Sequence, residues 1–365
     1  MQIRVVSSSI CEVKVYGMAP APPTETASGV GGERLADPEK FHIFEDMKKI
    51  AFVILLLLAA TGLSAQEQYG VVRISVCNMR RTPDFDAEMV SQALLGTPVH
   101  ILRINPEGNR WPEIQSPEGY TGWVHSAGIQ ILSKEAYSAW NTAEKVVVTA
   151  LTGIVYENPS AKGATLSDVV GGDRLKFLGT KGRFFNVGFP DGREGYLPKR
   201  LGERESEWRK HLDQSAEAII RTAKSMVGFP YLWAGMSPKG MDCSGFVRTV
   251  LYMHDIIIPR DASQQAPKGE RILIEPDCSN LVPGDLLFCG RRTPERYRVS
   301  HVAIYIGNRK FIHSLGLVQI ASLNPDDPDY DAYDHGRLLY ASRILPYIDR
   351  QEGLNTTATN PYYNE

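Results

Sequence analysis

One cysteine in this chain has the local sequence of a catalytic nucleophile. Cys243 follows Asp242, and the apolar run 246–253 predicts a helix that begins close to the cysteine. At a helix N-terminus the dipole and the free backbone amides favour thiolate, the nucleophilic form of cysteine. The same amides can hold the oxyanion of a tetrahedral intermediate. These features predict that Cys243 is a nucleophile.

A nucleophilic cysteine needs a base, and two histidines flank a predicted hairpin. His301 opens one strand-like run and His313 closes the next, with a Gly307-Asn308 turn between them. Strands joined by a tight turn lie side by side, so both histidines reach one edge of the sheet. We expect His301 to activate Cys243 and then protonate the leaving amine. His313 is expected to orient His301 as the third member of a triad.

Each of these residues also has an ordinary structural explanation. A single cysteine is often a small buried hydrophobe, and a single histidine in a strand is often a structural group. The combination of a nucleophile, a helix start and two hairpin histidines is more specific than any member alone.

The segment that holds these residues, 211–349, has an α+β pattern. Strand-like runs follow the predicted helix and end with a last strand over 337–344. Residues 203–225 have apolar positions at helical spacing and predict a helical connector. The polar tail 350–365 is expected to be disordered.

Two earlier segments, 66–132 and 143–203, are each typical of a small β-barrel, with short strands between Pro, Gly and Asn turns. Their endings, GYTGWVH and GREGYLP, indicate one supersecondary unit used twice. A short helical connector is predicted between them at 134–143.

A secretory signal is predicted inside the first third of the chain. Residues 47–65 have a positive start, an apolar run shorter than a membrane span, and a small-residue exit. An uncleaved membrane anchor is the alternative. Residues 1–46 are interpreted as an upstream, non-native extension, because a signal peptide belongs at the N-terminus. The mature protein is expected to be exported, periplasmic or secreted, without a stable membrane anchor.

Charge and cysteine content narrow the function further. The 365-residue chain has a formal net charge of −2 and no long basic run, which argues against nucleic acid as a partner. Cys278 and Cys289 could form a disulfide in an exported protein, and two buried thiols are the favoured alternative. A zinc site would need a tighter Cys/His pattern. No metal or organic cofactor is implied.

The third segment resembles the NlpC/P60 family of cysteine peptidases, and this implies a papain-like fold. The motifs that carry the resemblance are, in chain order, Tyr231-x-Trp233-x-Gly235, Asp242-Cys243-Ser244-Gly245-Phe246, Pro259-Arg260, Pro283-Gly284-Asp285-Leu286, Ser300-His301-Val302-Ala303-Ile304-Tyr305-Ile306-Gly307 and Ile312-His313.

The two barrels resemble bacterial SH3 (SH3b) domains. The matching pieces are Asn78-Met79-Arg80, Leu95-Gly96-Thr97-Pro98-Val99 and Gly122-Trp123-Val124, with a looser match in the second copy. Two generic barrels without a binding role are the alternative. Two SH3b domains before such a peptidase resemble the γ-D-glutamyl-L-diamino-acid endopeptidases, which cleave stem peptides that have a free N-terminal L-Ala.

This resemblance implies a set of substrate contacts. Asp242, with Glu88 and Tyr120 from the first barrel, would hold the free amine, since a buried ammonium needs a carboxylate partner. The further contacts implied are an aromatic wall of Tyr231 and Trp233, a polar contact from Ser244, and the segment Asp261-Ala262-Ser263. Relatives often have Ser where this chain has Ala262, which puts the polar contacts at that end of the pocket in doubt.

The leading hypothesis is a monomeric peptidase that trims released peptidoglycan peptides ending in meso-diaminopimelate or Lys, with the first barrel excluding longer chains. The second barrel is expected to be a spacer or a packing partner. A broader wall hydrolase would cut intact peptidoglycan and use the barrels as anchors. A non-catalytic binding module is a further alternative, which the intact set of Cys243, His301 and His313 disfavours. An acyltransferase or amidase on the same scaffold is another, and the context of Tyr231 and Asp242 favours peptide recognition instead.

Overall fold

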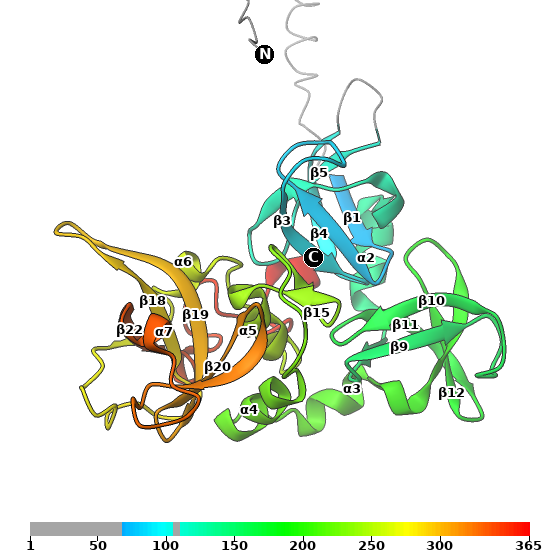
Figure 1. The fold of residues 1–365 in the computed structure, drawn as a ribbon. Coiled ribbons are helices and arrows are strands. Elements are labelled where there is room, and N and C mark those ends of the chain that lie inside the picture. The colour runs from blue at the N-terminus through cyan, green and yellow to red at the C-terminus, as the bar shows by residue number, and fades with distance from the viewer. Residues whose placement is uncertain (1–67, 105–109) are drawn as a thin grey trace, which may run out of the picture. The chain divides into compact units, whose positions relative to one another are not determined.

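The computed structural model describes residues 68–104 and 110–365 (Figure 1). The predicted signal peptide at 47–65 and the extension at 1–46 lie outside the described residues. No helix within the described ranges is long and apolar enough to cross a membrane.

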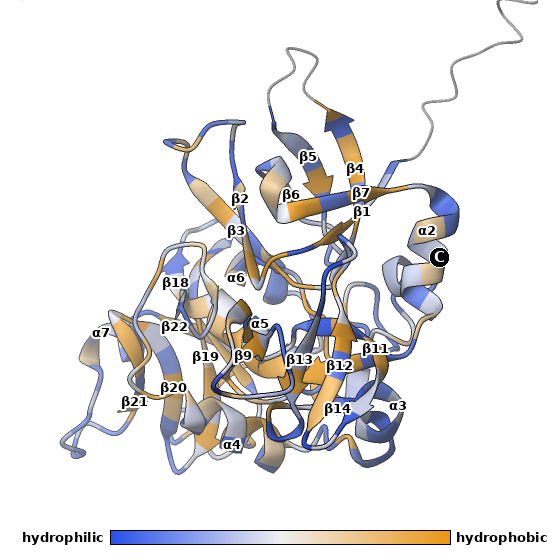
Figure 2. Cartoon of the chain, turned by 90° about the vertical axis from the view of Figure 1, so that its right-hand side faces the viewer, coloured by the Kyte–Doolittle hydropathy of each residue, from blue (hydrophilic) through white to orange (hydrophobic). Residues whose placement is uncertain are grey.

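The first barrel is a seven-stranded antiparallel sheet with the order β3-β2-β6-β5-β4-β1-β7. Its strands are β1 (Gln68–Val72), β2 (Val76–Arg80), β3 (Met89–Leu94), β4 (Pro98–Ile104), β5 (Pro112–Gln115), β6 (Thr121–Trp123) and β7 (Ile129–Leu132). Alternating residues of these strands point inward, and Val72, Met79 and Val99 are completely buried. Figure 2 shows apolar residues along the strands of both barrels.

The second barrel repeats this plan with the order β10-β9-β13-β12-β11-β8-β14. Its strands are β8 (Lys145–Val148), β9 (Thr152–Tyr156), β10 (Thr165–Val170), β11 (Arg174–Lys181), β12 (Phe184–Gly188), β13 (Glu194–Pro198) and β14 (Gly202–Arg204). Strand for strand the two orders are the same, so the predicted internal repeat is confirmed. Helix α2 (Lys134–Thr142) connects the barrels, and Ser133 caps its start.

The predicted continuous helix over 203–225 is wrong. Residues 202–204 form β14, which pairs with β8 and completes the second barrel. Helix α3 (Glu205–Trp208) and a short 3-10 turn follow, and α4 (Ala216–Ser225) begins only after its N-cap, Ser215. Pairing with the barrel stabilises the extended conformation more than helical spacing favours a helix.

The third domain packs helices against one face of a six-stranded antiparallel sheet with the order β17-β22-β18-β19-β20-β21. These strands are β17 (Glu270–Ile272), β18 (Leu286–Arg292), β19 (Tyr297–Gly307), β20 (Lys310–Leu315), β21 (Leu317–Ser322) and β22 (Leu338–Arg343). Helix α5 (Cys243–Tyr252) packs on β19 and β20, and α6 (Ala262–Gln265) on β19. A two-stranded sheet of β15 (Met236–Ser237) and β16 (Gly240–Met241) precedes α5.

The C-terminal segment 350–365 corrects the prediction of a disordered tail. Leu354 is completely buried, and Asn355 pairs with Ile257 in the third domain. The hydroxyl of Tyr137 on α2 donates to the carbonyl of Tyr362 at 2.9 Å. The tail is polar in composition, but its polar groups find partners in the first barrel, on α2 and in the third domain, so their burial is compensated.

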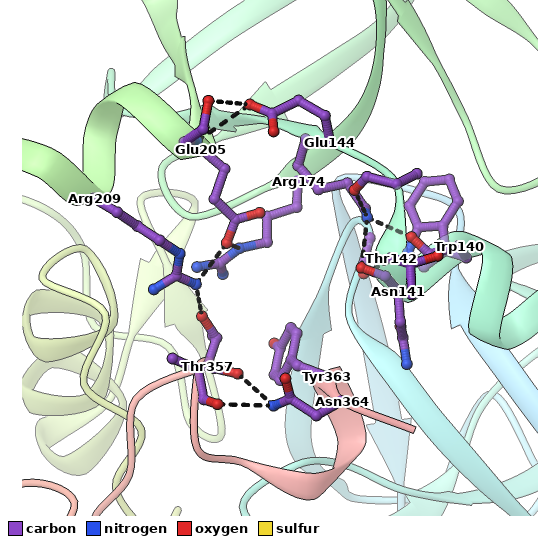
Figure 3. A pocket seen from close by; sticks show the side chains of 15 residues that line it. Trp140, Asn141, Thr142, Glu144, Arg174, Glu205, Arg209, Thr357, Tyr363 and Asn364 are labelled. Carbon is purple, nitrogen blue, oxygen red and sulfur yellow. Dashed lines mark hydrogen bonds and ion pairs between the residues drawn. The ribbon is translucent and has the colours of Figure 1, made fainter.

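A cavity of about 390 Å³ lies where the tail meets both barrels (Figure 3). Its charged side chains pair with one another: Arg209 binds Glu205 at 2.7 Å, and buried Arg174 lies 3.1 Å from Asp255. Asn364 donates to the carbonyl of Thr357 at 3.0 Å across the same space. We interpret this cavity as a structural junction that joins the second barrel and the tail to the third domain.

Candidate active site

Cys243 is the first residue of α5, as the sequence predicts. Asp242 is the N-cap, and its carboxylate accepts from the amide of Gly245 at 2.7 Å. A Cβ at Gly245 would lie 2.0 Å from the carbonyl oxygen of Gly235, so only glycine allows this close approach. The cap and this contact together fix the end of α5 from which the sulfur projects.

Burial keeps the Cys243 thiol protonated. It raises the pKa of Cys243 to about 11, and the neighbouring Asp242 carboxylate adds to the shift. The backbone amides of Val302 and Ser244 contact the sulfur and lower the pKa, but by less. Burial therefore outweighs the effect of the amides at the helix N-terminus, and ionisation of the thiol requires a base.

His301 lines the same pocket as Cys243 and is the candidate for that base, and the hairpin of β19 and β20 positions it. Nε2 of His301 lies 3.0 Å from Nδ1 of His313, and both side chains are buried. Because Nε2 faces His313, Nδ1 is the atom left to exchange a proton with Cys243, whose sulfur contacts the amide of the next residue, Val302. Burial lowers the pKa of His301 to about 4, so its ring is neutral and able to accept a proton at neutral pH.

Asp334 completes this group, and the sequence analysis missed it. Its Oδ2 lies 3.0 Å from Nδ1 of His313 and 3.4 Å from Nε2 of His301. Burial opposes the charge, but contact with His313 and the charges around it lower the pKa of Asp334 to about 2. For Nδ1 of His301 to accept the thiol proton, Nε2 must carry a hydrogen, which points toward His313 and Asp334. The carboxylate then stabilises the imidazolium that forms.

Short helix α7 (Ala332–His335) positions Asp334. Asp331 is the N-cap of this helix, and its side chain accepts from the amide of Asp334 at 2.9 Å. On the other side, Nε of Arg337 donates to Oδ1 of Asp334 at 2.9 Å. The only signal in the sequence is an N-cap pattern, which many surface loops share, so it does not point to a catalytic role.

The donor atoms of His301, His313 and Asp334 all lie within 4.8 Å of one another, close enough to share a metal ion. Within the described ranges this is the group whose geometry fits such a site. The imidazole pair and the carboxylate also fit a proton relay behind Cys243, a role that needs no ion.

A pocket of about 360 Å³ opens in front of Cys243 and His301. All of the substrate-contact residues inferred from the sequence line it: Glu88, Tyr120, Tyr231, Trp233, Asp242, Ser244, Asp261, Ala262 and Ser263. The lining residues that the sequence analysis did not single out are Arg81, Val90, Ala234, Val299, Ser300, Leu315 and Arg337. His313 lies behind His301 and is completely buried. Folding therefore brings the first barrel and the third domain together around one site.

The first barrel meets the third domain through Glu88. Its Oε2 accepts from Arg81 at 2.8 Å, and its Oε1 accepts from the indole of Trp233 at 3.2 Å. The hydrogen bond from Arg81 lowers the pKa of Glu88, so the carboxylate is ionised at neutral pH. Across the pocket, the hydroxyl of Tyr120 hydrogen-bonds to Asp261, whose pKa is raised by burial. We call this part of the pocket, which has the acids Glu88 and Asp261 and also Arg81 paired with Glu88, the acidic end.

Asp242 does not have a free carboxylate for a substrate. Its Oδ2 accepts from Arg260 at 2.7 Å and from the amide of Ala234 at 3.0 Å. Its Oδ1 accepts from Arg260 at 3.1 Å, in addition to the cap bond with Gly245. The contacts of Asp242 are therefore made within the protein, and direct binding of a substrate amine by this residue stays a prediction. The other acids of the pocket are Glu88, which is paired with Arg81, and Asp261.

Comparison with known proteins agrees with this geometry. Residues 228–333 match the NlpC/P60 family, and residues 79–129 match the bacterial dipeptidyl-peptidase Sh3 domain. A gamma-D-glutamyl-L-lysine dipeptidyl-peptidase of Bacillus cereus is 33% identical over 235 residues, which cover 62% of this chain and 67% of that protein. The chain belongs to the NlpC/P60 family.

Two further relatives extend the match across the barrels. The dipeptidyl-peptidase 6 of Lysinibacillus sphaericus is 27% identical over 268 residues, which cover 71% of this chain and 93% of that protein. The crystal structure of an NlpC/P60 family protein from Bacillus cereus superposes with a TM-score of 0.64 at 27% identity, covering 76% of this chain and all of that one. This chain is thus an NlpC/P60 cysteine peptidase, and its fold is α+β as predicted.

In this NlpC/P60 peptidase, Asp334→Asn is expected to lower kcat about tenfold to a hundredfold, because the charge that stabilises the His301 imidazolium is lost. The pKa of His301 should fall further, which moves the acid limb of the kcat profile to lower pH. Steady-state kinetics between pH 4 and 9 measure both effects.

Asp331→Asn is the matched control. Asn also caps a helix, and the Oδ2 of Asp331 lies 4.0 Å from Nε2 of His313, so its charge acts more weakly on the histidines. An unchanged kcat in Asp334→Asn, or an equal loss in both variants, would contradict a specific role for Asp334.

Proposed function

We propose that this NlpC/P60 peptidase hydrolyses the γ-D-Glu–L-diamino acid bond of peptidoglycan stem peptides that have a free N-terminal L-Ala. The products are L-Ala-γ-D-Glu and the peptide that begins with the diamino acid. The observation that carries this proposal is the acidic end of the pocket, where Glu88 and Asp261 face the space in front of Cys243. The printed names of the Bacillus cereus and Lysinibacillus sphaericus relatives support it.

The charges of the acidic end suit an ammonium group. Glu88 is ionised and shared between Arg81 and Trp233, and Asp261 is half-buried with Tyr120 as a neighbour. An ammonium taken from water needs such carboxylate partners to offset its desolvation. The tyrosine hydroxyl can accept a further N–H of the amine. The arrangement therefore favours a peptide whose N-terminus is free.

The first barrel supplies the specificity by blocking the pocket beyond the amine. Glu88 and Tyr120 come from this barrel, directly before β3 and β6, so the barrel would stand in the way of a chain attached to the amine. A muramic acid group on L-Ala would remove the positive charge and clash with the barrel. Selection for released peptides follows from both effects.

The reaction then proceeds in two steps, formation of a thioester on Cys243 and its hydrolysis. His301 takes the thiol proton as Cys243 attacks the γ-carbonyl carbon, and amides at the start of α5 are placed to receive the oxyanion. His301 gives that proton to the leaving amine, which departs and leaves an L-Ala-γ-D-Glu thioester. A water then gives one proton to His301 and attacks the thioester, and His301 passes that proton to the sulfur of Cys243, which leaves as the thiol.

The test is a mass-spectrometric digest with residues 66–365, which form one compact unit. One substrate is L-Ala-γ-D-Glu-meso-diaminopimelate, and the other is the same peptide attached to muramic acid. We expect L-Ala-γ-D-Glu from the free peptide alone. Equal cleavage of both substrates would contradict the gated pocket and favour a broader wall hydrolase.

Glu88→Gln is expected to raise KM for the free peptide about tenfold or more, because one charged partner of the ammonium is lost, while kcat changes less. Glu194→Gln, an exposed position on β13 of the second barrel, is the matched control and should leave both constants unchanged. An unaltered KM in Glu88→Gln would rule out this residue as an amine partner.

We further propose that the peptidase works outside the cytoplasm. The proposal is supported by the positive start, apolar run and small-residue exit of residues 47–65. Fractionation of cells that express the full chain, with N-terminal sequencing of the mature form, tests it. Mature protein beginning near Gln66 outside the cytoplasm is the expected result.

A further inference from the structure

The pocket has a cation at the end that lies beside His301. Arg337 lines it together with Ser300, and 22% of the arginine side chain is exposed. The guanidinium lies 4.3 Å from the centre of the Tyr333 ring and donates from Nε to Asp334. Nη1 makes one long contact of 3.4 Å with the hydroxyl of Ser300. Among the described residues, Nη2 has no hydrogen-bond partner.

These contacts fix the plane of the guanidinium and leave its outer edge free. Asp334 holds the Nε side, and Tyr333 covers one face. The two Nη atoms therefore present parallel N–H groups that have no strong acceptor. A carboxylate is the group that such an edge binds best, because its two oxygens match the spacing of the donors.

The place of Arg337 relative to His301 says which part of the substrate it meets. Asp334, which accepts a hydrogen bond from Arg337, also lies 3.4 Å from Nε2 of His301. Arg337 is therefore on the histidine side of the pocket. His301 delivers its proton to the leaving amine, and whatever follows that amine must lie on this side. The acidic end with Glu88 and Asp261 holds the opposite end of the peptide.

We propose that Arg337 and Ser300 form the binding site for a free carboxylate of the leaving diamino acid. This inference rests on the proposed function and adds the recognition of its second product. The charges of the pocket then match a zwitterionic peptide, with acids for the ammonium at one end and a guanidinium for the carboxylate at the other. The carboxylate is either the α-carboxylate of the diamino acid or the second carboxylate of meso-diaminopimelate.

The experiment compares acid and amide forms of one substrate. The compact unit of residues 66–365 is given L-Ala-γ-D-Glu-L-Lys and its C-terminal carboxamide, and kcat/KM is measured for each. The native enzyme is expected to prefer the acid about tenfold to a hundredfold, the usual effect of a charge-assisted hydrogen bond pair. Arg337→Gln should abolish that preference by losing activity on the acid selectively.

The ratio of kcat/KM for the acid to kcat/KM for the amide separates carboxylate binding by Arg337 from a structural role of this residue. Arg337 also touches Asp334, so a variant that merely disturbs the catalytic group would lose activity on both substrates equally, and that result would overturn the proposal. Arg296→Gln, an exposed position outside the pocket, should keep the native ratio. Cleavage of the amide at the γ-bond reports on the proposed function independently, so the two ideas can fail separately.

The source of the carboxylate is settled by two further substrates. L-Ala-γ-D-Glu-meso-diaminopimelate is compared with the same peptide amidated only at the α-carboxylate of its diamino acid. Continued dependence on Arg337 after amidation assigns the site to the side-chain carboxylate, and loss of that dependence assigns it to the α-carboxylate. Absence of any acid preference in the native enzyme on both the lysine and diaminopimelate pairs would overturn the proposal.

Discussion

Cys243→Ala is expected to lower kcat by at least about 10⁴-fold, because the thioester step then has no nucleophile. Alanine is close to cysteine in size, and the cap of Asp242 that fixes the start of α5 does not involve the sulfur. The fold and the pocket should therefore persist. Rapid-quench or steady-state assays measure the loss, and thermal denaturation checks the fold.

The control for this variant is Cys278→Ala. Cys278 is a buried free cysteine whose pKa is raised by burial, and it does not line the pocket, so it is an inert thiol. We expect its kcat to stay near the native value. Substantial hydrolysis by Cys243→Ala would overturn the assignment of the nucleophile and with it the cysteine-peptidase mechanism.

The largest effect on stability is expected from Asp242→Asn. Arg260 is among the most deeply buried large side chains, and its two Nη atoms bind the two oxygens of Asp242 at 3.1 Å and 2.7 Å. Asparagine keeps the N-cap but removes the charge, so a buried guanidinium is left without its counter-ion. Breaking a buried ion pair in this way costs about 3–5 kcal/mol of the free energy of unfolding.

Activity should fall together with stability in Asp242→Asn, because Asp242 also holds the helix end that presents Cys243. Asp261→Asn is the matched control: this acid is only half-buried and lies close to the same Arg260, but it makes no such pair. We expect Asp261→Asn to raise KM with little change in the unfolding free energy. Urea denaturation of both variants distinguishes them, and equal stability would contradict the buried-pair argument.

The two barrels and the catalytic hairpin could be predicted because their signals are local. A hairpin that has His301 and His313 on adjacent strands needs only a short turn and a period of two, and Nε2 of His301 lies 3.0 Å from Nδ1 of His313. The similar sequences GYTGWVH and GREGYLP contain β6 and β13, and these two strands have the same position in two sheets of identical strand order. Such features depend on neighbours in the sequence, so the sequence predicts them.

The predictions that failed depended on contacts made far along the chain. The tail 350–365 has the composition of a disordered segment, yet Thr357 donates to the buried carboxylate of Asp255 at 2.7 Å. Cys278 and Cys289, by contrast, are free and buried, which is the alternative that the sequence favoured. The composition of a segment indicates how much surface it can bury by itself. The polar side chains of this tail are instead hydrogen-bonded to residues of other domains.

From the sequence we could predict the candidate nucleophile, its histidine pair, the family fold and most of the pocket lining, because short motifs place these groups on particular strands and on one helix end. The raised pKa of Cys243, the position of Asp334 beside the histidines and the pairing of Asp242 with Arg260 became apparent only in the folded chain. Burial and charge proximity set these properties, and both depend on residues that meet only when the whole chain has folded.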